Sequence, residues 1–293
     1  MRDQAARLRE LSAQAAYSDF SSEASMNARV ITVASGKGGV GKSNFSVNLA
    51  LQMCKLGKRV VIVDADFGLA NIEILLGVAP KHSVSDVLAG KVGIEDALTK
   101  GPHGCLFLSG GTGLSALNEV TDSQLRRLTN GFLSLDSQAD CIIIDTRAGL
   151  SNAVINFAKA AEDIIIITTP DPTAIADAYS LIKSLKKTML ELDRLKLVVN
   201  CASNKDEAME VFGKLNAVSQ RFLSIELGLL GVIPYDPYLV KAVRRQKPVS
   251  IIYPFSESAN SINEIGTRLF NMESIKKNSV QNFVLKLIGK FTN

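Results

Sequence analysis

Short apolar runs alternate with segments of helical periodicity along most of this chain. Seven runs are rich in β-branched residues: 29–35, 59–66, 105–109, 141–146, 163–169, 195–200 and 229–234. Several are apolar at successive positions, which is typical of strands covered by helices on both faces. Six segments with helical periodicity lie between them: 43–56, 121–137, 151–161, 173–189, 205–223 and 256–271. The pattern predicts an α/β fold with a mostly parallel, doubly wound sheet, whose ligands bind at the carboxyl ends of the strands.

The two ends of the chain do not follow this alternation, and we expect three parts: residues 1–26, 27–272 and 273–293. The first part combines a short helical start with a serine-rich stretch, which is typical of a tethered peptide and linker. The third part is a separate basic helix with one apolar stripe at helical spacing. The stripe consists of Val280, Phe283, Val284, Leu287, Ile288 and Phe291.

The length of this stripe limits what the last helix can do. Twelve helical residues span about 18 Å, which is too short to cross a bilayer. Such a helix lies among lipid headgroups or packs its stripe against its own domain. We expect both: packing of the stripe against the domain, and release of the helix to an anionic membrane surface.

The basic excess of the chain lies in the same tail. The sequence holds 33 basic and 29 acidic residues, and residues 274–293 contain four lysines and no acid. Residues 1–273 are therefore balanced at 29 against 29. This balance does not indicate a general nucleic-acid-binding surface, so no direct contact with nucleic acid is expected.

Composition also bears on where the protein acts. No apolar run approaches the roughly 20 residues of a spanning helix, and the N-terminus lacks the apolar core of a signal peptide. We therefore expect a cytoplasmic protein. The four cysteines form no CxxC pair, so we expect buried, reduced thiols and not an iron–sulfur carrier.

The stretch Gly36–Ser43, GKGGVGKS, fits the pattern GxxxxGK[ST] between an apolar run and a helical segment. In this context, backbone N–H groups and the positive end of the following helix bind phosphate. Lys42 is expected to reach the β and γ phosphates of ATP, and the Ser43 hydroxyl is expected to bind Mg²⁺. The candidate nucleotide-binding residues of this segment are Gly36, Lys37, Gly38, Gly39, Val40, Gly41, Lys42, Ser43 and Asn44.

Three carboxylates follow apolar runs near this loop. Asp64 and Asp66 lie two residues apart, on one side of an extended segment. Asp145 ends the run 141–146, as the aspartate that holds magnesium does in nucleotide hydrolases. A single aspartate at a strand end is often only a helix cap, but the pair at 64 and 66 favours a functional site.

The box KGGVGKS resembles the deviant Walker A box of the MinD/ParA family of dimerising ATPases. The resemblance implies a P-loop NTPase fold of the MinD/ParA (SIMIBI) type, a homodimer with ATP, and a catalytic set of Lys37, Lys42 and Asp66. Lys37 would cross the dimer interface to the partner's nucleotide, where a cation stabilises the transition state of phosphoryl transfer. Asp66 would orient the attacking water or accept its proton, and Asp64 and Asp145 would support the Mg²⁺ shell.

The resemblance has consequences elsewhere in the chain. It implies that Asn200, Pro234 and Asp236 hold adenine, although turn formation equally explains 234–237. Arg147 departs from the family, whose members commonly have Gly or Pro there. It contacts phosphate or a partner, or it faces solvent, and we slightly favour solvent.

The N-terminal segment DQAARLR resembles the start of FlhG (FleN/YlxH) proteins, which regulate flagellar number and placement. The phrases DADFGLANIEILLGV, DAYSLIK and GVIPYD also resemble this branch. The resemblance implies that the N-terminal helix engages the GTPase FlhF and stimulates its hydrolysis. The residues concerned are Asp3, Gln4, Arg7, Leu8 and Arg9. It also implies contacts with flagellar ring proteins or a transcription activator, at the inner face of the membrane and at the cell pole.

Three alternatives remain at this stage. A MinD-type division-site ATPase shares the fold and the tail but should lack the DQAARLR extension. A ParA-like partition ATPase should carry a basic core surface. A protein that binds ATP without hydrolysing it is the third alternative, because of Arg147.

Overall fold

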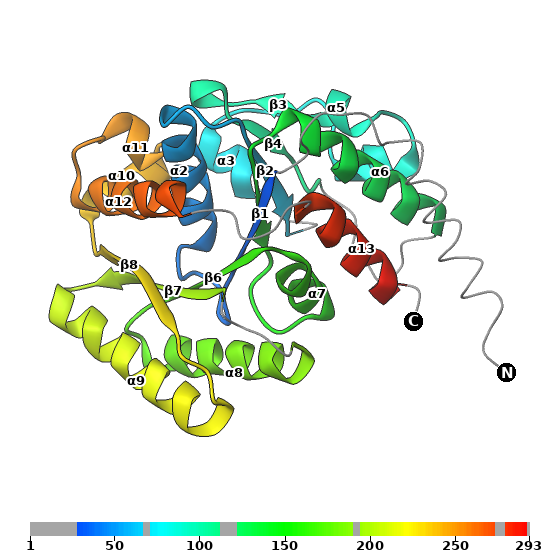
Figure 1. Ribbon diagram of the computed structural model, residues 1–293. Coiled ribbons are helices and arrows are strands. Elements are labelled where there is room, and N and C mark those ends of the chain that lie inside the picture. Colours follow the sequence, from blue (N-terminus) through cyan, green and yellow to red (C-terminus); the bar gives the residue numbers. More distant parts are fainter. Residues whose placement is uncertain (1–27, 67–70, 112–121, 190–193, 273–278, 292–293) are drawn as a thin grey trace, which may run out of the picture.

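An eight-stranded sheet forms the centre of the molecule (Figure 1). The computed structural model describes residues 28–66, 71–111, 122–189, 194–272 and 279–291. The strand order is β3-β4-β2-β5-β1-β6-β7-β8, and all neighbours are parallel except β3, which pairs antiparallel with β4. The strands are β1 (Arg29–Ala34), β2 (Val60–Ala65), β3 (Thr99–Lys100), β4 (Leu106–Leu108), β5 (Cys141–Thr146), β6 (Asp163–Thr168), β7 (Leu195–Ala202) and β8 (Gly228–Pro234).

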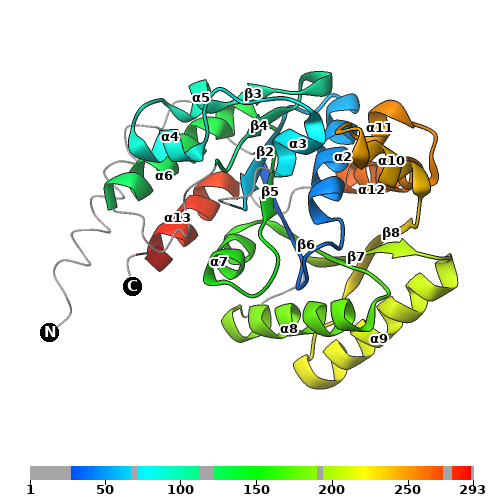
Figure 2. The ribbon, with the colours of Figure 1, turned by 180° about the vertical axis from the view of Figure 1, so that it is seen from behind.

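Helices cover both faces of the sheet (Figures 1 and 2). On one face α2 and α12 pack against β1, β2, β5, β6, β7 and β8. On the other face α4, α5, α6, α7 and α13 cover β1, β2 and β5, while α8 and α9 cover β6 and β7. The helices are α2 (Lys42–Lys55), α3 (Asn71–Leu76), α4 (Val84–Ala89), α5 (Ile94–Ala97), α6 (Asp122–Gln138), α7 (Asn152–Ala160), α8 (Pro172–Thr188), α9 (Lys205–Leu223), α10 (Pro237–Arg244), α11 (Val249–Ile252), α12 (Glu257–Asn271) and α13 (Ser279–Phe291).

The burial of the strands explains their sequences. β1, β2, β5 and β6 are buried at each of their six positions, which requires apolar side chains on both faces. The predicted α/β fold with a mostly parallel, doubly wound sheet is therefore confirmed. Strand β3 and the helices α3, α4, α5, α10 and α11 were not predicted, since they have two to eight residues and give little periodic signal.

The expectation of buried thiols holds only in part. Cys105 and Cys141 are buried and Cys54 is half-buried, but Cys201 is exposed. A register shift between β7 and β8 at Asn200/Ala202, together with a φ of 56° at Cys201, interrupts the inward alternation there. The expectation is wrong for Cys201.

Helix α13 packs against α6 and α7 on the second face of the sheet (Figure 2). Phe283 is fully buried, with its ring centroid 5.4 Å from that of Phe132 and 6.2 Å from that of Phe157. The other buried residues of the stripe are Val280, Val284 and Leu287. The side chains of Ile288 and Phe291 lie outside the described residues. No helix in the described ranges is both long and apolar enough to cross a membrane.

Candidate functional site

The loop between β1 and α2 requires glycine at defined points. Gly39 and Gly41 have φ of 80° and 89°, in the left-handed region. A Cβ on Gly36 would overlap the backbone carbonyl of Asp177 in α8, and one on Gly41 would overlap the side-chain amide of Asn200. The loop is therefore packed between α8 and the end of β7, while Gly38 and Gly39 are exposed.

Helix α2 begins where this loop ends, and its first turn suits an anion. Its N-cap is Gly41, no side chain caps it, and its first turn contains no acid. The backbone N–H groups of such a turn are left for a ligand, and the helix dipole favours negative charge there.

A buried ion pair links the first residue of α2 to the end of β5. Lys42 Nζ lies 2.9 Å from Asp145 Oδ1, and the Ser46 hydroxyl donates to the same oxygen at 2.9 Å. Lys42 is 8% exposed and Asp145 is fully buried. The second oxygen, Asp145 Oδ2, is buried and has no hydrogen-bond partner within the described part of the chain. A buried, unpartnered carboxylate oxygen fits a cation.

A second carboxylate lies beside the first, because β2 and β5 pair Asp64 with Asp145. Burial, and then the charge of Asp145, raises the pKa of Asp64 to about 7. The backbone N–H groups of Asp66 and Asn71 donate to its two oxygens, each at 3.1 Å. The structure thus brings Asp64 and Asp145 together at the carboxyl edge of the sheet, as the sequence predicts.

These side chains do not form a complete metal cage by themselves. Within the residues that the structure describes, no group of three His, Cys, Asp or Glu side chains is placed to hold a metal ion. Mg²⁺ commonly takes one or two carboxylates and completes its shell with water and substrate phosphates. Asp64 and Asp145, paired across β2 and β5, supply the two carboxylates of that donor set, and the Ser43 hydroxyl stays a predicted ligand.

Asp66 follows β2 directly, two residues after Asp64. Its Oδ2 accepts a hydrogen bond of 3.4 Å from Asn71 Nδ2, and its Oδ1 is 3.9 Å from Nε of Arg147. Burial raises the pKa of Asp66, although Lys42 and Arg147 oppose the shift. The Arg147 side chain is 64% exposed, so it faces solvent and also lies within ion-pair distance of Asp66.

Lys37 contacts its own chain. Its Nζ lies 2.8 Å from Asp171 Oδ2 and also bonds the Thr173 hydroxyl, both at the N-terminus of α8. This contact holds the pKa of Asp171 well below its usual range. Asp171 and Thr173 were not among the predicted site residues, although Asp-Pro-Thr directly after an apolar run is a recognisable helix start.

The residues predicted to hold adenine have structural partners. Asn200 Nδ2 donates to the Val40 carbonyl at 2.8 Å, and its Oδ1 is buried with no partner among the described residues. Asp236 caps α10 through the Tyr238 N–H at 2.8 Å and accepts the Ser258 hydroxyl at 2.6 Å. Pro234 ends β8. Asn200 thus supports the glycine loop, and Pro234 and Asp236 belong to the turn between β8 and α10. Adenine binding stays a prediction.

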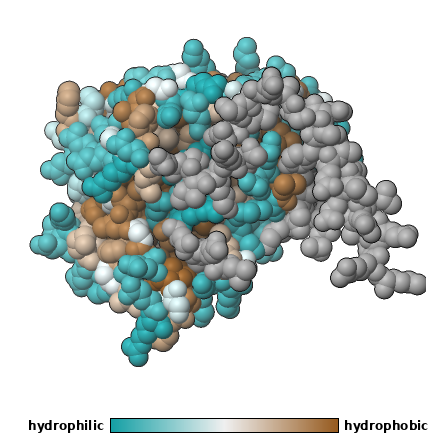
Figure 3. All heavy atoms as spheres, viewed as in Figure 1, coloured by the Kyte–Doolittle hydropathy of each residue, from teal (hydrophilic) through white to brown (hydrophobic). Residues whose placement is uncertain are grey.

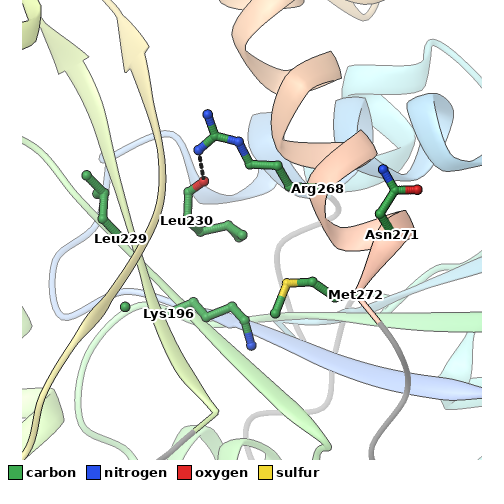
Figure 4. Close-up of a pocket in the computed structure, with 7 residues that line it drawn as sticks. Lys196, Leu229, Leu230, Arg268, Asn271 and Met272 are labelled. Atoms are coloured by element: carbon green, nitrogen blue, oxygen red, sulfur yellow. Dashed lines mark hydrogen bonds between the residues drawn. The ribbon is translucent and has the colours of Figure 1, made fainter.

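A cleft of about 500 Å³ lies at the other end of the sheet (Figure 4). It is lined by Lys196, Gly228, Leu229, Leu230, Arg268, Asn271 and Met272. Hydrophobic residues gather near β8 on this face of the molecule (Figure 3). The two basic side chains that line the cleft already have partners: Lys196 Nζ lies 2.6 Å from Asp163, and Arg268 donates to the Leu230 carbonyl at 3.1 Å. No predicted nucleotide-binding residue lines this cleft.

The family of the chain follows from comparison with known proteins. A family model described as "AAA domain" matches residues 28–197, more than half of the chain. The antiactivator FleN of Pseudomonas aeruginosa is 37% identical over 241 residues, which cover 82% of this chain and 86% of FleN. The chain belongs to the FleN/YlxH branch of the MinD/ParA ATPases. The flagellum site-determining protein YlxH of Helicobacter pylori is 32% identical over 268 residues, covering 89% of this chain and 90% of YlxH.

A solved structure of this family has the same fold. MinD from Pyrococcus horikoshii OT3, complexed with Mg-ADP, aligns with a TM-score of 0.68 and 25% identity, covering 83% of this chain and 96% of that chain. The family prediction and the assignment as an ATPase are thus confirmed.

Proposed function

We propose that this ATPase is a switch that binds ATP and Mg²⁺, dimerises, and controls the number or location of flagella. The observation that carries the proposal is the glycine loop at the open N-terminus of α2, with buried Lys42 and Asp145 beside it. The flagellar part rests on relatives named an antiactivator and a flagellum site-determining protein.

In this proposal the triphosphate binds along residues 36–44. The N–H groups of the loop bind its oxygens, and Lys42 exchanges its contact with Asp145 for one with the β and γ phosphates. Asn200, which already supports the loop through Val40, and the segment from Pro234 to Asp236 hold the adenine. Mg²⁺, held by Ser43, Asp64 and Asp145, would neutralise charge that develops on the phosphate oxygens.

Hydrolysis in this scheme depends on Asp66 and Lys37. Asp66, at the end of β2, orients the attacking water. Lys37 leaves Asp171 and reaches the partner's nucleotide, where its charge stabilises the leaving oxygens. The pair that it leaves is 38% and 46% exposed, so solvent screens the attraction between the two charges. Its loss is a small cost.

The tail connects the switch to a membrane in our proposal. In the described monomer, the stripe of α13 is buried against α6 and α7. ATP-driven dimerisation releases α13, and two copies then bind the anionic inner face of the cytoplasmic membrane at the cell pole.

Residues 1–26 provide the link to other proteins in this scheme, and they lie outside the described residues. Asp3, Gln4, Arg7, Leu8 and Arg9 engage FlhF and stimulate its GTPase, while the ATP-bound domain contacts flagellar ring proteins or a transcription activator. The division into 1–26, 27–272 and 273–293 remains part of this proposal. A synthetic peptide of residues 1–26 should accelerate GTP hydrolysis by FlhF, and an inert peptide would remove the FlhF link alone.

A phosphate-release assay tests the enzymatic part. Wild-type protein should release phosphate from ATP only with Mg²⁺, and Asp66→Ala should reduce the rate at least tenfold while retaining nucleotide binding. Asp206→Ala serves as the control, because Asp206 is an exposed aspartate in the first turn of α9. Equal rates for all three proteins, or none, would contradict the role given to Asp66.

A further inference from the structure

Asp66 and Arg147 face each other because of the sheet register. The last residue pair between β2 and β5 is Ala65 with Thr146. Asp66 directly follows Ala65, and Arg147 directly follows Thr146. Arg147 Nε and Asp66 Oδ1 are 3.9 Å apart.

The backbone around Arg147 is fixed although its side chain is exposed. Strand β5 precedes Arg147, and two residues later the Gly149 N–H donates to the Ser35 carbonyl at 2.9 Å. Ser35 immediately precedes the phosphate loop. The position of Arg147 is thus tied to both the loop and the end of β5.

Both oxygens of Asp66 have a polar neighbour. Oδ2 accepts from Asn71 and Oδ1 faces Arg147. A carboxylate that orients a water molecule must present a free oxygen to it, and a guanidinium beside Oδ1 competes with the water for that oxygen. This arrangement therefore opposes the role proposed for Asp66.

We propose that Arg147 is a positioning residue that restrains Asp66 in the resting subunit and slows basal ATP hydrolysis. The proposal rests on the proposed function, in which Asp66 orients the attacking water. The restraint is weak, because Arg147 is 64% exposed and partly exposed pairs contribute little. Its removal should change the rate by about 1.5- to 5-fold.

Steady-state kinetics of the full chain test this role. Arg147→Ala should raise kcat by about 1.5- to 5-fold without changing KM, and Arg147→Lys should retain the wild-type rate since it keeps the charge. In an Asp66→Asn background the alanine substitution should change nothing. Arg59→Ala is the matched control, because it removes an exposed arginine–aspartate pair, with Asp140, outside the site.

Three kinetic results would overturn the proposal. These are a lower kcat for Arg147→Ala, a change in KM alone, or the same gain in the Asp66→Asn background. The last result would mean that Arg147 acts on something other than Asp66.

A second measurement separates this proposal from the proposed function. The Nε resonance of Arg147, identified by its loss in Arg147→Lys, should change its chemical shift in nucleotide-free Asp66→Asn, while that of Arg59 stays unchanged. An unchanged Arg147 resonance would show that the pair does not form, whatever the ATPase activity. A changed resonance in a protein that neither binds nor hydrolyses ATP would leave the pair intact, but would refute both the proposed function and the restraint on hydrolysis.

Discussion

Truncation of Phe283 tests whether helix α13 is held to the domain by its apolar stripe. Phe283 is fully buried and its ring contacts those of Phe132 and Phe157 at centroid distances of 5.4 and 6.2 Å. Replacing a buried phenylalanine with alanine costs about 3–5 kcal/mol, from lost burial and the cavity left behind. Leu285, on the same helix, is 45% exposed, so Leu285→Ala should cost less than about 1 kcal/mol.

Amide hydrogen exchange of residues 280–287 measures the loss directly. A destabilisation of about 3 kcal/mol corresponds to exchange at least roughly one hundredfold faster, since each 1.4 kcal/mol is a factor of ten. Phe283→Ala should show this acceleration in α13 and Leu285→Ala should not. Equal exchange rates in the two variants would refute the reasoning that burial of Phe283 fixes the helix.

Three further predictions concern the loop, the carboxylates and Lys37. Gly41→Ala should weaken binding of a fluorescent ATP analogue at least tenfold, because a Cβ there overlaps Asn200, whereas Gly57→Ala, with a φ of 85° but open space around it, should not. Burial raises the pKa of Asp64 to about 7 in the folded protein, whereas the same carboxyl titrates near 4 in the unfolded chain. The folded state therefore binds the proton more tightly. Stability of the Mg²⁺-free protein should therefore fall as pH rises from about 4 to about 7, with a flatter profile for Asp64→Asn in urea unfolding; parallel profiles would contradict this. Asp171→Ala removes the carboxylate partner of Lys37 and leaves the Thr173 hydroxyl, so it should increase the association constant of the ATP-bound dimer by up to about fivefold in sedimentation experiments; a decrease would contradict a resting contact.

The sequence was sufficient for the sheet and for placing Asp64 and Asp145 at its carboxyl edge, since both rest on local patterns. The apolar run 141–144 is typical of a strand covered on both faces, and Asp145, which follows it, falls at the carboxyl edge of the sheet. The glycines of residues 36–41 predict a tight loop because few other sequences need that conformation.

Local sequence patterns could not predict contacts between segments that are distant in the sequence. The partners of Lys37 at Asp171 and of Arg147 at Asp66 depend on strand register and helix packing. The sequence of the tail fits a membrane and a protein groove equally well, and only the tertiary structure shows that Phe283 has a site between α6 and α7. Helix α10 was missed because its eight residues give little periodic signal, although Asp236 caps its start.

Light scattering coupled to size-exclusion chromatography tests the central claim most directly. With Mg-ADP the protein should elute at its monomer mass of 31.5 kDa, and with Mg²⁺ and a non-hydrolysable ATP analogue at twice that mass. Lys37→Ala should bind the analogue and remain monomeric. A wild-type protein that stays monomeric when saturated with the analogue would contradict the account of two subunits that close over paired nucleotides.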